Sequence, residues 1–536
     1  MTGRQSERRT LEGLLARFAT EGRARGTRLG DRPVPASDLA STEVTGVTLD
    51  SRDVRPGSLF AAIPGLHQDG HDFAPAAVEA GAAGLIVERP LPGVAAAQIV
   101  VDASRAALAS AAAWWYGDPS HQLTVVGITG TDGKTTTAYL AVAALEAAGL
   151  PTGMIGTIAT RIGGSTDDHA VHATTPEAPE LQRTLRAMVD AGDRVAVIET
   201  TSHGLALNRV ASVAYDVAIV TNVTHEHLEL HGTWEAYRDA KLSLFDRLRE
   251  ARAVTKPHPV PAAAIVNLDD PSAGLFIGTS RDAGARVITY GTESAADVRA
   301  TRITEDGQGL HADVTTTRGD TTIDLRLAGR FNIHNALAVL AMGEALDLDP
   351  AKVREGLASL EIVPGRMERI ERGQSFGVVV DFAHSPASLT TVLDLLAPAA
   401  AARGGGLIAV FGSAGERDTV KRPQMGRIAG ERARLVVVTD EDPRGEDREA
   451  ILDEIARGAE AAGRRRGHDL LLIADRRAAI AAAFEAARPG DIVLLAGKGH
   501  EQSIIGRDGE EPWNERAVAE ELLDAMGTEA SGSAPR

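Results

Sequence analysis

The sequence predicts an α/β fold that is divided among several domains. Short apolar strands alternate with helical stretches along most of the chain, a glycine loop joins a strand to a helix near residue 130, and the alternation restarts beyond residue 365. With 536 residues the chain has room for three or four domains, each large enough for its own hydrophobic core.

Composition limits the class of protein. Hydrophobic residues at 43% and charged residues at 24% are ordinary for a soluble globular protein. The net charge of −18 argues against non-specific binding to nucleic acid or anionic membranes, and the absence of cysteine excludes disulfides. No run approaches the ~20 apolar residues of a membrane span, and the N-terminus lacks the long apolar segment of a signal peptide. We therefore expect a cytoplasmic protein that binds neither nucleic acid nor membrane.

The first predicted domain has short strands at 44–49, 59–62, 85–87 and 98–101, with helical pieces between them. It contains the polar segment LDSRDVRPGSLF at 49–60. These are turn residues on one interpretation, with Pro56-Gly57 making a tight turn. On the other, the loop offers Ser51 and Arg52 to an anionic or nucleotide ligand, and the segment alone leaves both open.

The segment LTVVGITGTDGKTTT at 123–137 has the pattern strand, glycine loop, helix. Gly130 and Gly133 allow backbone N–H groups to wrap around a phosphate, the helix N-terminus favours negative charge, Lys134 adds a cation and Thr135 a Mg²⁺-binding hydroxyl. The standard P-loop spacing would place glycine at 128, where this chain has isoleucine. A plain glycine turn would not need the lysine and three threonines, so we predict a nucleoside triphosphate site.

Two further strands of this central region end in polar residues. The strand at 195–198 leads into Glu199, and ligands of α/β proteins gather at the carboxyl ends of strands, which makes Glu199 a Mg²⁺ candidate. The strand at 215–221 is followed by HEHLELH at 225–231, which lacks the helical zinc pattern, so a magnesium role for one of these histidines is the more coherent interpretation. Lys241 follows on a helix and, taken alone, is typical of a surface lysine.

The last part of the chain begins after an edge of antiparallel strands expected over 298–327 and a boundary near 363–368. Strands at 378–382, 407–411, 435–439, 470–473 and 492–495 alternate with helices, which predicts a doubly wound, largely parallel sheet. Charged residues follow several of these strands, at 381–384, 413–422, 440–444 and 497–501. We expect this edge to receive a small charged substrate.

Nine segments together resemble the Mur ligases, the ATP-dependent peptide synthetases of peptidoglycan assembly, and follow the order of the MurE branch. They are DSRxVxPGxLF (50–60), GTDGKTT (130–136), TTPE (174–177), ExxSHGL (199–205), EHLELHG (226–232), DFAHSP (381–386), GERDxxKRPxMG (415–426), DPRGE (442–446) and GKGHE (497–501). The resemblance covers roughly residues 44–525. It implies a three-domain architecture with a small N-terminal α/β domain that binds UDP-MurNAc (40–121), a central P-loop ATPase-like domain that binds ATP (122–363) and a C-terminal Rossmann-like domain that binds the amino acid (364–526).

The same resemblance implies roles for individual residues. Catalysis falls to Lys134, Lys241, Glu199 and His227, and Mg²⁺ ligation to Thr135, Glu199, His227 and a Lys241 carbamylated by CO₂. ATP contacts are Gly130, Thr131, Asp132, Gly133, Lys134, Thr135, Thr136, Asn332 and His384. The UDP-MurNAc-dipeptide contacts are Leu49, Ser51, Thr174, Thr175, Thr201 and Arg209, and the amino-acid contacts are Arg417, Asp442, Arg444, Gly497 and Glu501.

The implied enzyme is a monomer that adds a diamino acid to UDP-MurNAc-L-Ala-D-Glu through an acyl phosphate. Enzymes of this branch that use meso-diaminopimelate have asparagine where this chain has Asp442. The extra negative charge weakens pairing of Arg444 with a distal carboxylate and suits a side chain that ends in an amine, so meso-diaminopimelate and L-lysine or L-ornithine all remain open.

The alternatives are a sister ligase, namely MurF, MurD or folylpolyglutamate synthase, and a P-loop NTPase that acts as a binding module. The DPRGE and GKGHE segments argue against MurF, and the DSRxVxPGxLF segment argues against folylpolyglutamate synthase.

Overall fold

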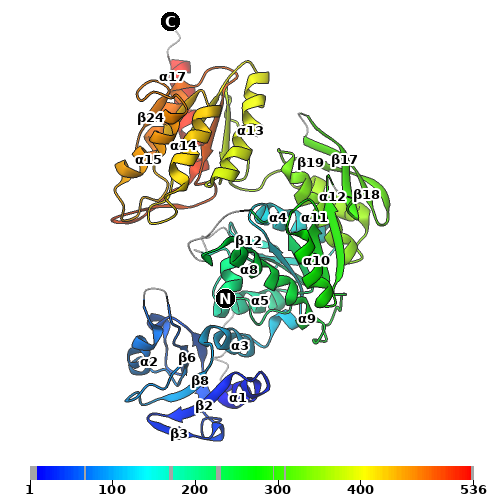
Figure 1. Ribbon diagram of the computed structural model, residues 1–536, viewed down its shortest axis with the longest axis vertical. Coiled ribbons are helices and arrows are strands. Elements are labelled where there is room, and N and C mark those ends of the chain that lie inside the picture. The colour runs from blue at the N-terminus through cyan, green and yellow to red at the C-terminus, as the bar shows by residue number, and fades with distance from the viewer. Residues whose placement is uncertain are drawn as a thin grey trace. The chain divides into compact units, whose positions relative to one another are not determined.

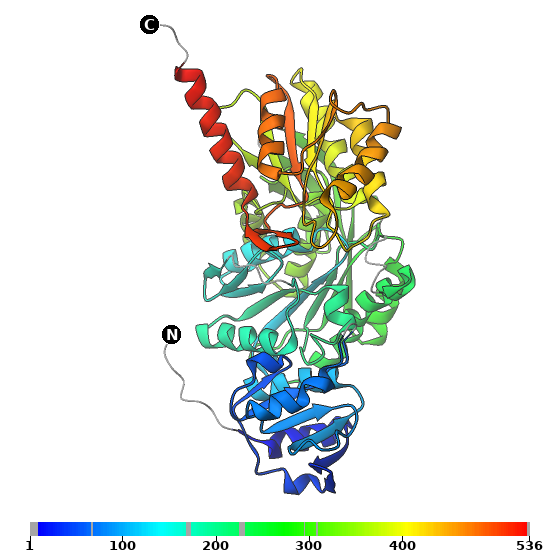
Figure 2. The same cartoon turned by 90° about the vertical axis from the view of Figure 1, so that its left-hand side faces the viewer.

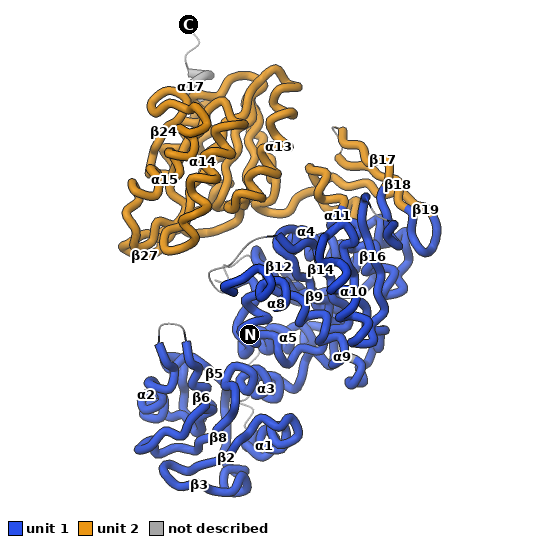
Figure 3. Tube along the Cα trace, in the orientation of Figure 1, with its two compact units in different colours: residues 1–300, 315–319, 334–356 blue, residues 301–314, 320–333, 357–536 orange. Residues whose placement is uncertain are grey.

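The computed structural model describes residues 9–65, 68–167, 173–224, 231–293, 295–306 and 309–532. The chain forms two compact units, one of residues 1–300, 315–319 and 334–356 and the other of residues 301–314, 320–333 and 357–536 (Figure 3). Among the described residues, none of the helices has both the length and the apolar character that a membrane crossing needs.

The first unit begins with a six-stranded sheet in the order β3-β2-β8-β7-β6-β5 (Figure 1). Strands β5 to β8 are parallel, and β2 pairs antiparallel with both β8 and β3. Because side chains alternate along a strand, Leu59 faces a core with α1 and α3, while Phe60 faces a core with α2. The elements are β1 (Arg9–Thr10), α1 (Leu11–Thr20), β2 (Ala24–Leu29), β3 (Arg32–Val34), β4 (Glu43–Val44), β5 (Gly46–Thr48), β6 (Ser58–Ala61), α2 (Ala74–Glu79), β7 (Gly84–Val87), β8 (Ala97–Val101) and α3 (Ser104–Tyr116).

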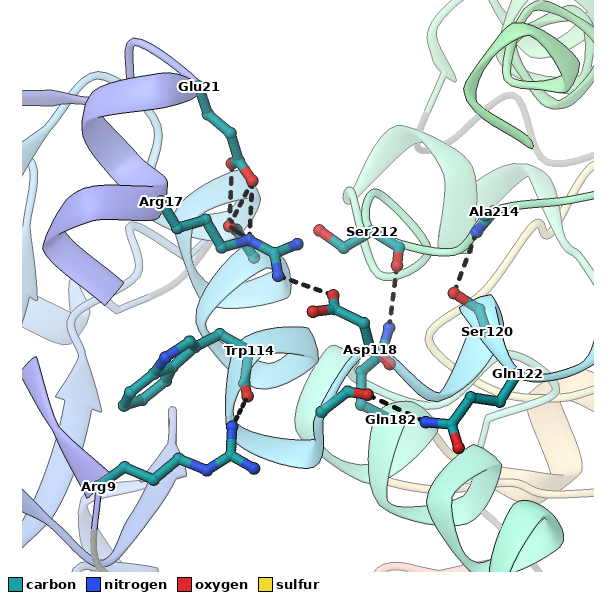
Figure 4. Close-up of polar contacts among 12 residues, drawn as sticks. Arg9, Arg17, Glu21, Trp114, Asp118, Ser120, Gln122, Gln182, Ser212 and Ala214 are labelled. Carbon is teal, nitrogen blue, oxygen red and sulfur yellow. Dashed lines mark hydrogen bonds and ion pairs between the residues drawn. The ribbon is translucent and has the colours of Figure 1, made fainter. Parts of the chain in front are cut away.

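A short polar segment after α3 ties this sheet to the rest of the first unit (Figure 4). The helix ends at Gly117 in the left-handed region, and Asp118 then accepts a hydrogen bond of 2.7 Å from Arg17 of α1. Two residues on, the Ser120 hydroxyl accepts a bond of 3.2 Å from the backbone N–H of Ala214, just before a strand of the central sheet. Residues 117–121 are therefore held from both sides.

The central sheet of the chain has the order β12-β11-β10-β13-β9-β14-β15-β16-β17-β18-β19. From β10 to β17 its strands are parallel, so their carboxyl ends lie along one edge, with Glu199 beside Ile128 in the register. Helices α5, α8 and α10 contribute to one buried core with these strands. The elements are β9 (Thr124–Thr129), α4 (Lys134–Ala147), β10 (Thr152–Ile155), β11 (Thr160–Ile162), β12 (Ser165–Asp167), α5 (Ala178–Ala191), β13 (Val195–Glu199), α6 (Ser202–Ala206), β14 (Val217–Val220), α8 (Trp234–Asp246), α9 (Leu248–Ala251), β15 (Ala263–Asn267), α10 (Ala273–Asp282), β16 (Arg286–Gly291), α11 (Phe331–Ala345) and α12 (Pro350–Ser359).

The predicted edge strands over 298–327 are confirmed as β17 (Val298–Asp306), β18 (Gly309–Thr316) and β19 (Gly319–Leu325). Only Thr317 and Arg318 separate β18 from β19, a loop length that joins antiparallel neighbours. The boundary between the two compact units falls inside β17 and β18.

The second unit contains the predicted doubly wound sheet, in the order β20-β21-β25-β22-β23-β24. Every neighbouring pair is parallel except β20 with β21. Helices α13, α14 and α15 cover one face (Figure 1), and α16 and α17 cover the other, where α17 is the red helix of Figure 2. The elements are β20 (Glu368–Ile370), β21 (Gly377–Asp381), α13 (Pro386–Ala402), β22 (Leu407–Phe411), α14 (Lys421–Arg432), β23 (Leu435–Val438), α15 (Arg448–Ala461), β24 (Leu470–Leu472), α16 (Arg476–Ala486), β25 (Ile492–Ala496), β26 (Ser503–Gly506), β27 (Gly509–Pro512) and α17 (Glu515–Gly532).

Candidate active site

The glycine loop joins β9 to α4 as predicted, and its two glycines are sterically required. Gly130 has φ 149° and Gly133 has φ 83°. A Cβ on Gly130 would lie 1.8 Å from Oγ1 of Thr221, and one on Gly133 would lie 2.5 Å from Oδ1 of Asn335. Both positions therefore exclude a side chain on grounds of space as well as backbone conformation.

The residues that follow β14 hold the glycine loop through hydrogen bonds. The backbone N–H groups of Thr131 and Asp132 donate to the carbonyl and the side-chain oxygen of Asn222, at 2.8 and 2.9 Å. The hydroxyl of Thr221 donates to the Asp132 carbonyl at 2.6 Å. Gly130, Thr131, Asp132 and Gly133 form a turn, and Lys134, Thr135 and Thr136 begin the fourteen-residue helix α4. A turn at a helix N-terminus is a geometry that favours an anion.

Glu199 is completely buried at the carboxyl end of β13, beside this turn. Its Oε2 accepts hydrogen bonds from the hydroxyls of Thr135 at 2.8 Å and Thr157 at 2.9 Å, and its Oε1 accepts from the Thr157 backbone N–H at 2.9 Å. The sequence pointed to Thr135 and Glu199, and the structure brings them together. Nothing in the sequence singled out Thr157, because it lies after β10 in a segment without a motif.

Two lysines converge on one carbonyl oxygen of the glycine loop. Lys134 Nζ donates to the carbonyls of Gly130 at 2.9 Å and Thr131 at 2.6 Å, and Lys241 Nζ donates to the Gly130 carbonyl at 2.7 Å. Lys241 is only 1% exposed and its ammonium lies 4.3 Å from the centre of the Tyr237 ring. Its surface interpretation is therefore wrong, and α8 places it against the loop.

Only some of the residues predicted to bind metal lie within the described part of the chain. His227 and the rest of residues 225–230 lie outside them. Among the described residues, no three His, Asp or Glu side chains gather as a metal-binding group. The Thr135 hydroxyl and the Glu199 carboxylate are hard oxygen donors of the kind that Mg²⁺ prefers, so the residues present fit that ion.

The four central residues predicted to contact the dipeptide form one hydrogen-bonded group next to Glu199. Thr175 Oγ1 donates to the Glu199 carbonyl at 2.9 Å and accepts from the Thr201 backbone N–H at 3.0 Å. Arg209 donates to the Thr175 carbonyl at 2.9 Å and pairs with Glu177 at 3.0 Å. Thr174 reaches the same group through the Thr157 hydroxyl, at 3.1 Å.

Leu49 and Ser51 lie at the end of β5 and in the following turn, both half-buried. The neighbouring Asp50 caps this turn by accepting from the Arg52 backbone N–H at 2.9 Å, and its carboxylate also pairs with the Arg52 guanidinium. Arg52 is therefore paired with Asp50 within the turn, while its side chain is 88% exposed.

The two other predicted ATP contacts belong to the second unit. Asn332 Nδ2 donates to the Ala328 carbonyl at 2.7 Å, and His384 Nδ1 donates to the Phe382 carbonyl at 2.9 Å. The first unit instead has Asn335, which accepts from the Thr137 hydroxyl at 3.2 Å and lies against Gly133. Asn335 belongs to the segment FNIHN at 331–335, three residues after the predicted contact Asn332.

The second unit gathers charge at the carboxyl ends of β23 and β25. Lys498, 1% exposed, donates to Asp442 Oδ1 at 2.8 Å and pairs with Glu501 at 2.6 Å. Asp442 Oδ1 also accepts from the Ile505 backbone N–H at 2.9 Å. Burial raises the pKa of Glu501, and the ammonium of Lys498 offsets only part of that effect.

Around this ion pair lie Glu441, Arg444 and Gly497, while Arg417 is on an exposed loop. Among the described residues, neither Arg444 Nε nor Glu441 Oε2 has a hydrogen-bond partner, although both atoms are buried. Arg444 Nη2 is 4.0 Å from Asp442 Oδ2. A Cβ on Gly497 would lie 3.5 Å from Glu441 Oε2, which places Gly497 directly beside that oxygen. The cluster offers one guanidinium and one carboxylate to a charged ligand.

Three family models match successive parts of the chain. Residues 43–116 match the Mur ligase family catalytic domain, residues 128–343 the Mur ligase middle domain, and residues 365–499 the Mur ligase glutamate ligase domain.

Whole-chain relatives agree. A UDP-N-acetylmuramyl-tripeptide synthetase of Roseiflexus sp. (strain RS-1) is 48% identical over 90% of this chain and 95% of its own length. A UDP-N-acetylmuramoyl-L-alanyl-D-glutamate–2,6-diaminopimelate ligase of Geobacter metallireducens is 42% identical over 88% and 93%. A solved ligase of the latter name is 30% identical, with a TM-score of 0.61 over 91% of this chain and 96% of its own. The chain belongs to the Mur ligase family.

Proposed function

We propose that the protein is a MurE-type ligase that adds a diamino acid to UDP-MurNAc-L-Ala-D-Glu at the expense of ATP, in cytoplasmic peptidoglycan precursor synthesis. The observation that carries the proposal is the joining of Thr135 to Glu199 at 2.8 Å directly behind the glycine loop. That arrangement suits a nucleoside triphosphate, and the full-length relatives named above are tripeptide synthetases and diaminopimelate ligases.

The proposed reaction has two steps. The γ-carboxylate of D-Glu attacks the γ-phosphorus of ATP, which gives an acyl phosphate and ADP. The amine of the diamino acid then attacks the acyl carbon, phosphate leaves with the bonding electron pair, and the amine loses a proton.

The first step brings two anions together, which is the difficulty that the loop residues address. Lys134 would leave the loop carbonyls to which it donates and pair with the transferred phosphoryl group. The backbone N–H groups at the start of α4 would hold the remaining phosphate oxygens. Thr135, Glu199 and, as further proposals, His227 and a carbamylated Lys241 would hold Mg²⁺, which when bound offsets charge on the phosphates.

The dipeptide end of the acceptor substrate would be held by Thr174, Thr175, Thr201 and Arg209. Arg209 lies within this hydrogen-bonded group and has a buried Nε that, among the described residues, has no partner. A guanidinium with a spare donor suits a carboxylate of the dipeptide. Leu49 and Ser51 would contact the uridine diphosphate at the far end.

The position of Asp442 changes the argument about the diamino acid. Its charge is offset by the buried ammonium of Lys498, so it does not act as a free anion beside Arg444. Arg444 Nε and Glu441 Oε2 remain for a ligand that carries both a carboxylate and an ammonium at its far end. This arrangement favours meso-diaminopimelate, and L-lysine or L-ornithine would use Glu441 alone.

The test is phosphate release from ATP by the purified protein with UDP-MurNAc-L-Ala-D-Glu and, separately, meso-diaminopimelate, L-lysine or L-ornithine. Mass spectrometry of the product identifies the residue that is added. We expect release that depends on one diamino acid. Folded protein that binds ATP but releases phosphate with none of them would refute the proposal and point to a sister ligase or an NTPase module.

A further inference from the structure

A buried ion pair in the second unit lies outside every motif that the sequence offered. Arg476, the first residue of α16, and Glu515, the first residue of α17, have side chains that are both 0% exposed. Arg476 Nη2 donates to Glu515 Oε1 at 2.6 Å, and Nε donates to Oε2 at 2.9 Å. The carboxylate also accepts from Trp513 Nε1 at 2.6 Å. The pair is bidentate and fully enclosed.

The rest of the guanidinium is turned toward the acceptor region. Nη1 donates to the carbonyl of Asp440 at 2.9 Å, and Nη2 donates to the carbonyl of Ala496 at 2.8 Å. Asp440 follows β23 and Ala496 ends β25, and β22 lies between these strands in the sheet. One side chain thus bridges two strand ends that are not neighbours.

These two carbonyls stand directly before the charged segments of the site. Glu441 and Asp442 follow the first, and Gly497 and Lys498 follow the second. The guanidinium is planar and its hydrogen bonds have fixed directions, so it sets the distance between the two segments as well as holding each one. The Lys498–Asp442 bond, which closes the same gap, depends on that distance.

The charge of Arg476 is maintained despite its burial. Burial alone would lower its pKa, but the charge and hydrogen bonds of Glu515, with smaller effects of Glu441 and Glu501, raise it instead. An apolar pair of similar size could fill the same space without the cost of desolvating two charges. Packing therefore does not account for an arginine at this place, whereas holding two carbonyls does.

We propose that Arg476, oriented by Glu515, is a positioning residue for the incoming amino acid, because it fixes residues 441–444 relative to residues 497–501. The inference rests on the proposed function, since the amino acid is its ligand. Arg476 and Glu515 are 39 residues apart and begin two different helices. Together they would control the shape of an acceptor site whose contacts with the amino acid come from other segments.

The test replaces the whole pair, R476M/E515L, so that no buried charge is left without a partner. We expect a folded protein whose KM for the diamino acid rises about tenfold or more, while the KM values for ATP and UDP-MurNAc-L-Ala-D-Glu stay within about twofold. The single variant R476K keeps the positive charge and can still donate a hydrogen bond in one direction. It should therefore have a lower KM for the diamino acid than R476M/E515L.

The matched control is the buried pair of the first unit, Lys256 with Asp216, in which each side chain is 3% exposed. Lys256 also donates to two carbonyls, of Leu123 and Ala214, at 3.0 and 2.8 Å. These lie at the amino ends of strands β9 and β14 in the first unit. K256M/D216L should leave the KM for the diamino acid unchanged.

Hydrogen exchange gives a readout that needs no turnover. In R476M/E515L the amides of 441–444 and 497–501 should exchange faster by about tenfold, with the strands of the same sheet unchanged. Faster exchange with an unaltered acceptor KM would overturn the positioning role, as would an equal rise in all three KM values. If the wild type adds no diamino acid, the proposed function fails first, and the exchange result then reports only on the geometry.

Discussion

Glu199 is the residue on which the proposed nucleotide site depends most. It accepts three hydrogen bonds and is fully buried, and Glu199→Gln would keep its shape but turn one acceptor into a donor that faces a donor. We expect turnover to fall by roughly 10²-fold or more, because the substitution removes a negatively charged oxygen ligand proposed for Mg²⁺. Steady-state phosphate release at several Mg²⁺ concentrations measures this.

A carboxylate near the C-terminal end of α4, the helix that begins at the glycine loop, provides the control. Glu146 of α4 accepts from the Thr152 backbone N–H at 3.0 Å, away from the glycine loop. Glu146→Gln should keep most of the activity. Equal losses in the two variants would mean that Glu199 acts through the stability of α4 and not through the nucleotide.

Substitution of Lys241 tests the expected carbamate. Its Nζ is buried at the Gly130 carbonyl, so Lys241→Ala removes a hydrogen bond to the loop as well as any carbamate. We expect turnover to be nearly abolished, and we expect the wild type to incorporate ¹³C-bicarbonate into a carbamate signal detected by NMR. A K241A enzyme with a normal rate, or a fully active wild type without that signal, would remove the carbamate role.

At this scale the sequence predicted individual residues better than their partners. Thr135 and Glu199 follow a loop motif and a strand end, which local pattern reveals. The bond from Lys498 to Asp442 joins residues 56 positions apart, and no local pattern carries that information. For this reason the sequence treated Asp442 as an unpaired charge, and the structure does not.

At the scale of elements, the glycine loop makes a steric prediction. Gly130→Ala would place a methyl group 1.8 Å from Thr221 Oγ1, at a φ that side chains rarely adopt. The loop must move, and we expect a loss of about 2–4 kcal/mol in the free energy of unfolding together with weaker ATP binding. Denaturant unfolding and nucleotide titration measure the two effects.

A helical glycine in the same unit serves for comparison. Gly278 of α10 has nothing within 4 Å of the position of an added Cβ. Gly278→Ala should change stability by no more than about 1 kcal/mol, in the stabilising direction. Comparable losses at both glycines would contradict a steric cause at Gly130.

Element prediction succeeded where the apolar period was clear and failed where it was not. The strands of the second sheet are runs of valine, leucine and isoleucine, because both faces are covered by helices. The hairpin β2–β3 is mostly exposed and rich in arginine, so its sequence has no such apolar run. Strands β2 and β3, which the sequence did not predict, complete the first sheet at one edge.

At the scale of the whole molecule, the sequence predicted a doubly wound sheet in the last part of the chain but not which of its strands would be neighbours. Strand β25 lies between β21 and β22, although it is the last parallel strand in the chain. This placement brings GKGHE next to both DFAHSP and DPRGE, and it depends on long-range pairing that no segment encodes alone. The three-domain division of residues 40–121, 122–363 and 364–526 stays a prediction, and the family matches support it.

Because the sheet β20-β21-β25-β22-β23-β24 lies wholly in the second unit, a buried charge beside it should affect that unit first. Asp491 in the second unit has a side chain 2% exposed and accepts from the Gly406 and Arg488 backbone N–H groups, both at 2.7 Å, and from Arg434. Burial would raise its pKa, but these bonds outweigh it and lower the pKa below 3.8. A lowered folded-state pKa means that Asp491 stabilises the fold above about pH 4 and loses that contribution as pH falls further.

Asp491→Asn should therefore destabilise the second unit by about 2 kcal/mol at pH 7 and flatten the fall of its stability between about pH 4 and pH 2. Hydrogen exchange resolved by segment measures this, because amides of β21, β22 and β25 should exchange faster while those of β9, β13 and β14 keep their rates. Asp524→Asn, at an exposed pair with Arg372, should change neither the exchange nor the pH profile appreciably. Equal acceleration in both sheets would show that the two units unfold as one, and the separation into two compact bodies would then have no energetic counterpart.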